Sequence, residues 1–517
     1  LLTSGRIRAF ATLGLTVTEV SGWFCFLTLR EGLDPGLLTE TLLTFGLGGG
    51  AVALFARHLG FFSAAGILGS IPLEEGDKTI PPEDQRNPAA AVYAMSSFLH
   101  DPAAGMATAW RCLLVASFVL GLLSYGPRGL GAQAMLFPLL VACAGVLATL
   151  ISALRGFPEQ KPLEETLSRR LWSNLWLTLL LIGAAAMPFC FLMFGTLRPC
   201  LPLALGLLCA PAMAWSTRLS ALAPPPENMS SDGKVPIRAW FTIALYGALP
   251  LALLLGTLLG AFWLLGGGDS PIAGLYGVTL AGVGLLAPMG DLLTLSSCGA
   301  LAQGVISLTW MSGDMAEPDW APGLALLGKG FATAGRGYSL ALTLTSSLLL
   351  LLARMGSRAM VPTLSLLLAG GILLGLILVC AVAALLLLGC RKTVASLRAE
   401  TQRQFKEIKG LRSGKEAPHT LSCVDLTNSR SLFWTLAGVL LTLVFPALAA
   451  ALGVAVALGF ALGAITLSLL AGFFLITAGD HWMGTPLADA VLPLRWAVGP
   501  ALGELVLLAL TALVVLM

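Results

Sequence analysis

The sequence predicts an all-α integral membrane protein, a polytopic helical bundle, on the basis of three observations. Of its 517 residues, 57% are hydrophobic and only 11% are charged, and the mean hydropathy is +0.88. This composition lies far from that of soluble globular proteins. Apolar runs longer than the ~20 residues that a helix needs to cross a bilayer recur along the whole chain. No separate soluble domain fits between them, so we predict that residues 1–517 form a single transmembrane bundle domain.

The apolar runs give about thirteen predicted transmembrane helices. They cover residues 9–29, 36–58, 89–124, 131–154, 171–195, 199–222, 237–266, 273–311, 322–353, 360–389, 431–450, 452–477 and 497–517. The run 273–311 is taken as one long tilted helix, and two short helices broken near Ser296 and Ser297 are the alternative. Small residues are frequent inside the runs, which favours close packing of many helices. A bundle of this kind fits a transporter, a pump or a membrane anchor.

The basic residues predict the orientation, because Lys and Arg accumulate in cytoplasmic loops. With the start of the chain on the cytoplasmic side, the inside loops hold 21 basic residues and the outside loops hold 5. An odd number of spans then places Met517, the C-terminus, on the opposite side. The net charge of +3 is what this rule requires, so it gives no indication of a nucleic-acid partner. Membrane lipid is the partner that the composition itself implies.

Two segments, 72–88 and 390–428, are predicted to lie on the cytoplasmic side. The first is rich in proline and charge and is predicted to be a loop. The second is predicted to continue the preceding span as a helix to about Leu411, where Gly410 and then Ser413 and Gly414 end it. Its apolar stripe suggests a helix that lies on the membrane surface or on neighbouring helices, with its basic residues facing phospholipid head groups.

The ten cysteines form no CxxC motif and no cluster with His, so they are predicted to be small core residues and no metal site is expected from them. The chain begins at Leu1, and the segment from Leu1 to Arg8 does not form a signal peptide. We therefore expect that the chain is processed or that the sequence lacks its start.

Eight strings, in order along nearly the whole chain, identify a family resemblance. They are "AVALFARHLGFFSAAG" (51–66), "IPPEDQRNPA" (80–89), "AGM" (104–106), "GLYGVTLAGVGLL" (274–286), "GKGFA" (328–332), "RQFKEIKGLRSGKEAPHTLSCVDL" (403–426), "TAGDHW" (477–482) and "GPAL" (499–502). Together they resemble the membrane-bound, ion-pumping pyrophosphatases. The resemblance implies a homodimeric bundle of about sixteen helices, of which this chain matches all but the first three, with an inner ring of six helices that holds pyrophosphate and magnesium above an ion gate.

The family's charged positions are mostly replaced in this chain. By the resemblance, its carboxylates and lysines fall on Ala64, Ile67, Ile71, Ala94, Phe98, Ala109, Cys112, Ser296, Gln303, Ala488, Leu492 and Leu507. Two or more magnesium ions need several oxygen ligands each, and lysines must neutralise the phosphoryl oxygens. These replacements supply no carboxylate, so the resemblance predicts that catalytic residues are absent, that the magnesium ligands are lost and that no cofactor is bound.

Four charged residues keep family positions or lie close to them: Arg57, Asp101, Lys329 and Arg495. They form the residual binding set that the resemblance suggests, either for an anion or as an internal salt bridge. Ionisable residues inside apolar runs are costly and by default suggest function. The full set of candidates in the spans is Glu19, Glu40, Arg57, His100, Asp101, Arg111, Asp291, Lys329 and Arg336.

Three functions follow from these observations. The first is a non-catalytic, pyrophosphatase-like structural or accessory subunit that forms a homodimer or joins other membrane-protein subunits. The second is a transporter or channel that reuses the bundle; it would need a new polar path, and the replacements are mostly apolar. The third is an active pyrophosphate-energised proton or sodium pump, which the overall resemblance supports.

Overall fold

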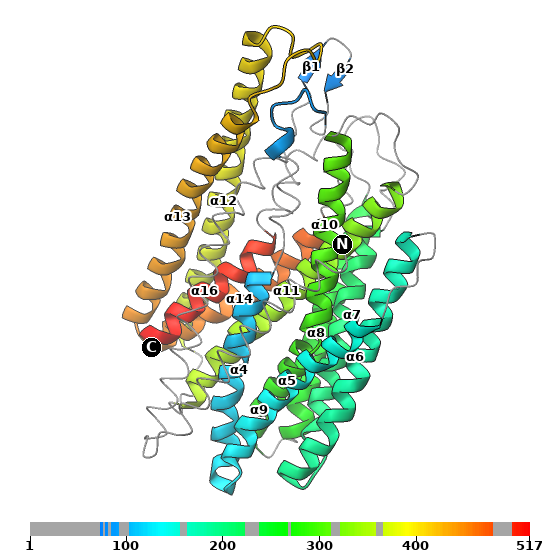
Figure 1. Ribbon diagram of the computed structural model, residues 1–517. Coiled ribbons are helices and arrows are strands. Elements are labelled where there is room, and N and C mark those ends of the chain that lie inside the picture. Colours follow the sequence, from blue (N-terminus) through cyan, green and yellow to red (C-terminus); the bar gives the residue numbers. More distant parts are fainter. Residues whose placement is uncertain are drawn as a thin grey trace.

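The computed structural model describes residues 73–75, 78–80, 84–92, 103–155, 163–222, 237–266, 270–311, 321–357, 365–478 and 499–517 (Figure 1). Its helices run side by side as an elongated bundle, which confirms the predicted all-α membrane fold. The predicted spans 9–29 and 36–58 lie outside the described residues. The other eleven each correspond to a helix, or to a bent pair of helices, in the described part of the chain.

The helices are α4 (Ala103–Tyr125), α5 (Gly131–Leu154), α6 (Leu163–Phe194), α7 (Cys200–Leu222), α8 (Ile237–Gly266), α9 (Pro271–Leu286), α10 (Met289–Met311), α11 (Ala321–Ser357), α12 (Leu366–Glu407), α13 (Thr420–Ala451), α14 (Val454–Ala478) and α16 (Gly499–Leu516), with a short 3-10 helix η1 (Gly126–Arg128) between α4 and α5. Nine helices of the described residues are long and apolar enough to cross a membrane, or ten if the bent pair α9 and α10 is one span.

The predicted single helix 273–311 is wrong in one respect, because α9 and α10 meet at a bend of 46°. The bend lies at Ala287 and Pro288, ahead of the Ser296 and Ser297 break that was the alternative. Proline has no backbone N–H and its ring clashes with the preceding turn, which ends or kinks a helix. The Pro288 carbonyl accepts the backbone N–H of Asp291 at 3.2 Å, so α10 begins directly after the break.

Glycines set the distance between neighbouring helices. A Cβ at Gly371 of α12 would lie 2.2 Å from the carbonyl oxygen of Val456, and one at Gly459 of α14 would lie 2.1 Å from that of Leu368. Between α7 and α9, a Cβ at Gly206 would lie 1.9 Å from the carbonyl oxygen of Ala281. These backbones touch, as expected for transmembrane helices packed through small residues.

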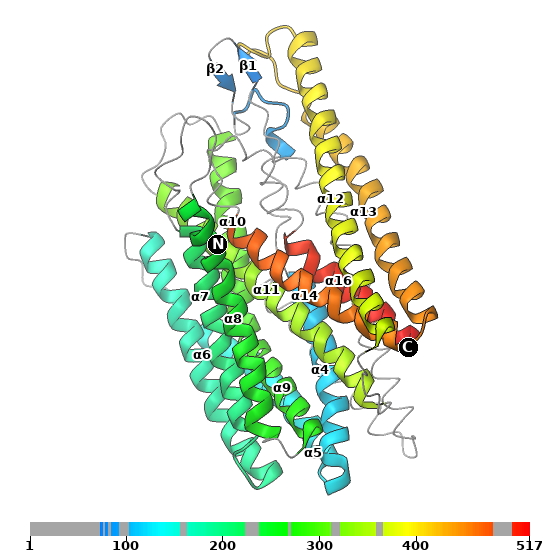
Figure 2. The same ribbon diagram turned by 180° about the vertical axis from the view of Figure 1, so that it is seen from behind.

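Helix α12 continues beyond the predicted membrane span to Glu407, which confirms the predicted helical continuation to about Leu411 within a few residues, and Figures 1 and 2 show it beside α13. Of the two predicted placements, on the membrane surface or on neighbouring helices, contact with a neighbouring helix is confirmed by the packing of α12 on α13. The physical reason is that α13 begins already at Thr420, so the apolar stripe of α12 has an antiparallel partner. Gly410 (φ 104°) and Gly414 (φ 72°) form the turn between them, as predicted.

The predicted loop 72–88 contains a small β-hairpin, which is the exception to the all-α prediction among the described residues. Strand β1 (Leu73–Glu75) pairs antiparallel with β2 (Lys78–Ile80), and Glu75 lies opposite Lys78. Further along the segment, Arg86 donates from Nη1 to the carbonyl of Arg412 at 3.2 Å and so ties it to the α12–α13 turn.

Candidate functional site

The face between α10 and α11 carries two of the positions where the family resemblance implies charge, Ser296 and Gln303. They lie seven residues apart on α10 and contact Gly335 and Gly328, which are also seven residues apart on the antiparallel α11. A Cβ at Gly335 would lie 2.2 Å from Ser296 Oγ, and one at Gly328 would lie 3.3 Å from Gln303 Cγ. Ser296 is 1% exposed. The two helices are thus in close contact along this face, and no ion-sized space separates Ser296 from α11.

Two further implied charge positions lie on α4, at Ala109 and Cys112, and both side chains are fully buried. The carbonyl of Ala109 accepts a hydrogen bond from Ser346 Oγ of α11 at 2.8 Å. On α16 the implied gate lysine position is Leu507, which is also fully buried in the main hydrophobic core. These three positions contribute to helix packing instead of presenting charge.

Of the four residual charged residues, only Lys329 lies in the described part of the chain. It is half-buried on α11, and its carbonyl accepts from Thr333 Oγ1 at 3.0 Å. Arg57, Asp101 and Arg495 lie outside the described residues, so their proximity to Lys329 stays a prediction. The same holds for the replaced positions Ala64, Ile67, Ile71, Ala94, Phe98, Ala488 and Leu492.

Other ionisable side chains are buried in the bundle, as the sequence predicts for Asp291 and Arg336. Asp291 lies in the first turn of α10, where a negative charge is favoured, and its Oδ1 accepts from Ser152 Oγ of α5 at 3.3 Å. Sequence reasoning missed Glu504, which is 2% exposed on α16. A lone acidic residue in an 18-residue apolar helix was the signal that could have found it.

A dense polar cluster joins the ends of α12 and α13, on the side predicted to be cytoplasmic. The Gln404 amide nitrogen donates to Ser422 Oγ at 2.8 Å, to the His419 carbonyl at 3.1 Å and to Glu400 Oε1 at 2.9 Å. Its amide oxygen accepts the backbone N–H of His419 at 3.0 Å. Arg403 forms an ion pair with Glu400 at 2.8 Å. Both the nitrogen and the oxygen of the buried Gln404 amide are thus engaged in holding the turn together.

An ion pair next to this cluster involves Asp84 and Arg86. Arg86 donates to Asp84 from its backbone N–H at 2.9 Å and from Nη2 at 2.6 Å. The side-chain hydrogen bond from Arg86 lowers the pKa of the Asp84 carboxyl below its ordinary value of 3.8, against the opposing effect of partial burial. Asp84 is therefore ionised in the folded protein at neutral pH and holds Arg86 in place beside the α12–α13 turn.

The described residues do not fit a magnesium pyrophosphate site. Within the described ranges, no group of three or more His, Cys, Asp or Glu side chains lies close enough to hold a metal ion. At the implied positions on α4, α10 and α16 the structure offers Ala109, Cys112, Ser296, Gln303 and Leu507. These side chains include no carboxylate, whereas magnesium prefers carboxylate oxygens and water in octahedral geometry.

The arrangement of long, glycine-packed helices with a broken α9–α10 pair defines a polytopic α-helical membrane protein. Residues 1–484 match the family described as inorganic H+ pyrophosphatase. The chain belongs to this family, which confirms the resemblance identified from the eight strings.

Three relatives illustrate the range of the family. The chain is 24% identical over 508 residues to a "K(+)-insensitive pyrophosphate-energized proton pump" of Methanosarcina mazei, covering 92% of this chain and 72% of the relative. It is 25% identical over 531 residues to a proton pump of the same name from Streptomyces coelicolor, covering 93% and 65%. A Clostridium tetani relative, whose name assigns it to the K(+)-stimulated pyrophosphate-energized sodium pumps, is 24% identical over 412 residues, covering 76% and 59%. The match thus spans little more than half of the length of the Clostridium relative.

Proposed function

We propose that this chain is a non-catalytic member of the pyrophosphatase family and serves as a structural or accessory subunit of a membrane complex. The observation that carries the proposal is the packing at the implied charge positions. Ala109, Cys112 and Leu507 are fully buried, and Ser296 lies against Gly335 of α11. A metal-bound polyphosphate needs charged ligands and space for ions at such positions, and close-packed small and apolar side chains supply neither.

Retained packing supports the structural half of the proposal. The glycine contacts of α12 with α14 and of α7 with α9 hold the bundle together without any catalytic charge. Many large apolar side chains point outward, among them Phe241, Leu245 and Trp263 of α8, and can face lipid or another subunit. A second copy of this chain, or other membrane-protein subunits, are the partners that we propose.

The competing function is a pyrophosphate-energised pump. It is supported by the match over residues 1–484 and by the names of the relatives. A transporter or channel for another solute is the third candidate, and it requires a polar path through the bundle.

Phosphate release from magnesium pyrophosphate by the purified full chain separates these functions. We expect no release above that of a detergent blank, because loss of a single catalytic group already costs roughly 100-fold or more. The Methanosarcina relative, prepared in the same way, is the positive control. Sustained release by this chain that disappears in a Lys329→Ala variant would contradict the proposal and establish the pump.

The subunit role is tested by the native mass of the complex extracted in mild detergent. Twice the chain mass of 53.7 kDa would establish a homodimer, and unlike chains in a fixed ratio would establish an accessory subunit. A monomer at all protein concentrations, in the membrane as well as in detergent, would contradict a subunit role.

A further inference from the structure

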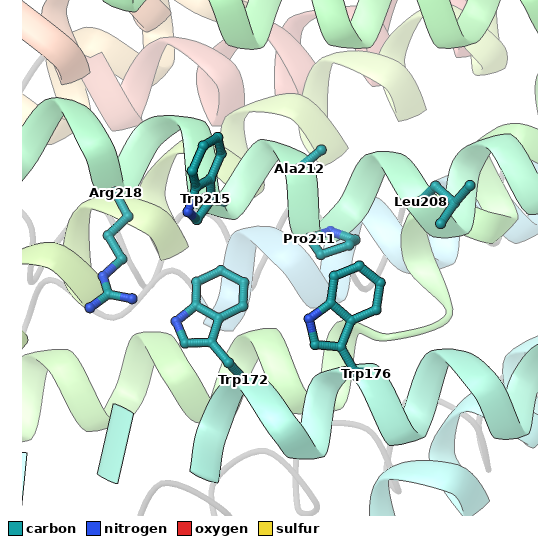
Figure 3. A pocket seen from close by; sticks show the side chains of 7 residues that line it. All are labelled: Trp172, Trp176, Leu208, Pro211, Ala212, Trp215 and Arg218. Carbon is teal, nitrogen blue, oxygen red and sulfur yellow. The ribbon is translucent and has the colours of Figure 1, made fainter. Parts of the chain in front are cut away.

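A groove of about 460 Å³ opens between α6 and α7 on the outer surface of the bundle (Figure 3). Helix α6 packs along α5 and only loosely on α7, which leaves the groove open. Trp172 and Trp176 line it from α6, and one face of α7 supplies Leu208, Pro211, Ala212, Trp215 and Arg218. Trp176 and Trp215 are each 54% exposed, so the groove faces the surroundings of the bundle, which for membrane-spanning helices is lipid.

The groove is polar at one end and apolar at the other. Figure 3 shows Arg218 at one end and Leu208 at the other, with the tryptophan rings between them. In the same view the indole nitrogens of Trp172 and Trp176 lie on the Arg218 side of their rings. Arg218 lies in the last turns of α7, at the end predicted to be cytoplasmic. Tryptophan is enriched where the head groups of a bilayer meet its hydrocarbon, so this polarity matches that of a lipid leaflet.

The Arg218 guanidinium is fixed in place at the polar end of the groove. Its carbon lies 5.8 Å from the centre of the Trp172 ring and 5.1 Å from that of Phe331, and Nη2 donates to Ser168 Oγ at 3.3 Å. No carboxylate of the described residues forms an ion pair with it. Arg218 Nε and Trp172 Nε1 are both buried without a hydrogen-bond partner among the described residues. Both atoms are enclosed by protein, so an anion in the groove would be bound through the outer nitrogens of the guanidinium, whose position the ring contacts already fix.

We propose that this groove binds one phospholipid with an anionic head group from the leaflet predicted to be cytoplasmic. The phosphate accepts from the outer nitrogens of the Arg218 guanidinium, and an acyl chain runs over Trp176 and Pro211 toward Leu208. A negative head group is favoured because the Arg218 charge has no carboxylate to neutralise it among the described residues. This inference does not depend on whether the chain hydrolyses pyrophosphate.

The site is in contact with the inner helix α11. A Cβ at Gly330 would lie 3.3 Å from Arg218 Cγ, so the Arg218 side chain packs directly on α11 one residue after Lys329. A bound lipid would therefore stabilise the contact of α7 with α11, and we expect the thermal stability of the full chain to rise when the lipid is added.

Native mass spectrometry of the full chain in mild detergent, with dioleoyl phosphatidylglycerol or dioleoyl phosphatidylcholine added, tests the proposal. We expect one retained phosphatidylglycerol per chain and little phosphatidylcholine. Arg218→Gln should lower phosphatidylglycerol retention about tenfold, because hydrogen bonds to a charged group are lost. Arg169→Gln is the matched control, because the Arg169 side chain is 80% exposed and pairs with Glu165. This variant should retain as much phosphatidylglycerol as the unmodified chain.

A second variant, which keeps the Arg218 guanidinium, tests the groove even if Arg218→Gln fails to fold. Ala212→Trp fills the groove from α7, so it should also lower retention while it leaves Arg218 intact. Equal retention of the two lipids by the unmodified chain, or full retention by both groove variants, would overturn the proposal. So would displacement of phosphatidylglycerol by inorganic phosphate alone, since the site would then recognise a free anion.

Discussion

Two regions of the molecule use polar side chains differently. They are the turn between α12 and α13 and the face between α10 and α11. At the α12–α13 turn, the buried Gln404 amide makes hydrogen bonds through both its nitrogen and its oxygen. Between α10 and α11, the position where the family resemblance implies a carboxylate is Ser296, packed on a glycine. The chain thus keeps polar residues where the backbone needs their hydrogen bonds and has small residues where the family pattern would place a ligand-binding charge.

The largest effect that would sharpen this comparison is expected from Ser296→Asp. The new carboxylate would be buried against Gly335 in a closely packed face, and burial of a charge without a satisfying partner costs several kcal/mol. We expect the free energy of unfolding to fall by more than about 3 kcal/mol, measured as loss of thermal stability in detergent. Ser296→Ala, the control, should change it little.

Retained stability of Ser296→Asp would contradict the proposed difference between the two regions. If Ser296→Asp keeps full thermal stability and gains stability from added magnesium, the face between α10 and α11 still accommodates a charged site. The packing argument for a non-catalytic chain would then fail.

The next largest effect concerns two adjacent glycines of α12. Gly371→Ala would place a Cβ 2.2 Å from the Val456 carbonyl oxygen and force α12 and α14 apart, which we expect to cost about 2–3 kcal/mol. Gly370→Ala meets no atom within 4 Å, and alanine favours a helix, so stability should be unchanged or slightly raised. Thermal unfolding of both variants provides the measurement, and equal stability of the two would contradict glycine-mediated packing.

A smaller effect is expected at the α12–α13 turn. Gln404→Leu leaves the His419 backbone N–H without its acceptor and removes the hydrogen bond that Ser422 Oγ accepts, and we expect a loss of about 2 kcal/mol in the free energy of unfolding. Gln402→Leu on the exposed side of the same helix is the control and should be near neutral. Thermal unfolding and proteolysis of residues 408–419 are the measurements. Equal behaviour of the two variants would show that the polar cluster does not hold the turn.

The sequence predicted the helices better than their ends and bends. Long apolar runs were sufficient to predict the helices, because a backbone in lipid must satisfy its hydrogen bonds within the helix. The β-hairpin and the early start of α13 could not be read from hydropathy, since both lie in polar sequence where tertiary contacts decide. The bend at Pro288 had a local signal, but the run 273–311 was assigned as continuous because the family resemblance implies one continuous helix there.

The candidate sites show the same limit. The sequence predicted which family positions lack charge, because each position is read from its neighbours in the matched strings. It counted Arg218 among the basic residues of a cytoplasmic loop, while the structure places it in α7 against Trp172 and Phe331. Such a contact joins three helices, and no spacing within one helix reveals it.

The smallest effect is expected from Asp84→Asn. Because Arg86 lowers the pKa of Asp84 in the folded state, the ionised carboxylate stabilises the fold above its ordinary pKa of 3.8, and this contribution is lost as the pH falls through the lowered value. The pair is partly exposed, so solvent screening limits the effect to about 0.5 kcal/mol at neutral pH. Thermal unfolding of the unmodified chain and the variant at several pH values is the measurement.

The difference in stability between the unmodified chain and Asp84→Asn should shrink toward zero at strongly acidic pH, where Asp84 is protonated in both the folded and the unfolded chain. It should also shrink at high salt, since an exposed ion pair is screened. A difference that is constant from neutral to acidic pH would mean that Asp84 acts through the shape of its hydrogen bonds to Arg86 and not through its charge. The polar region at the α12–α13 turn would then depend on the fit of its hydrogen-bonded groups and not on charge. In that respect it would resemble the face between α10 and α11, where Ser296 packs on Gly335.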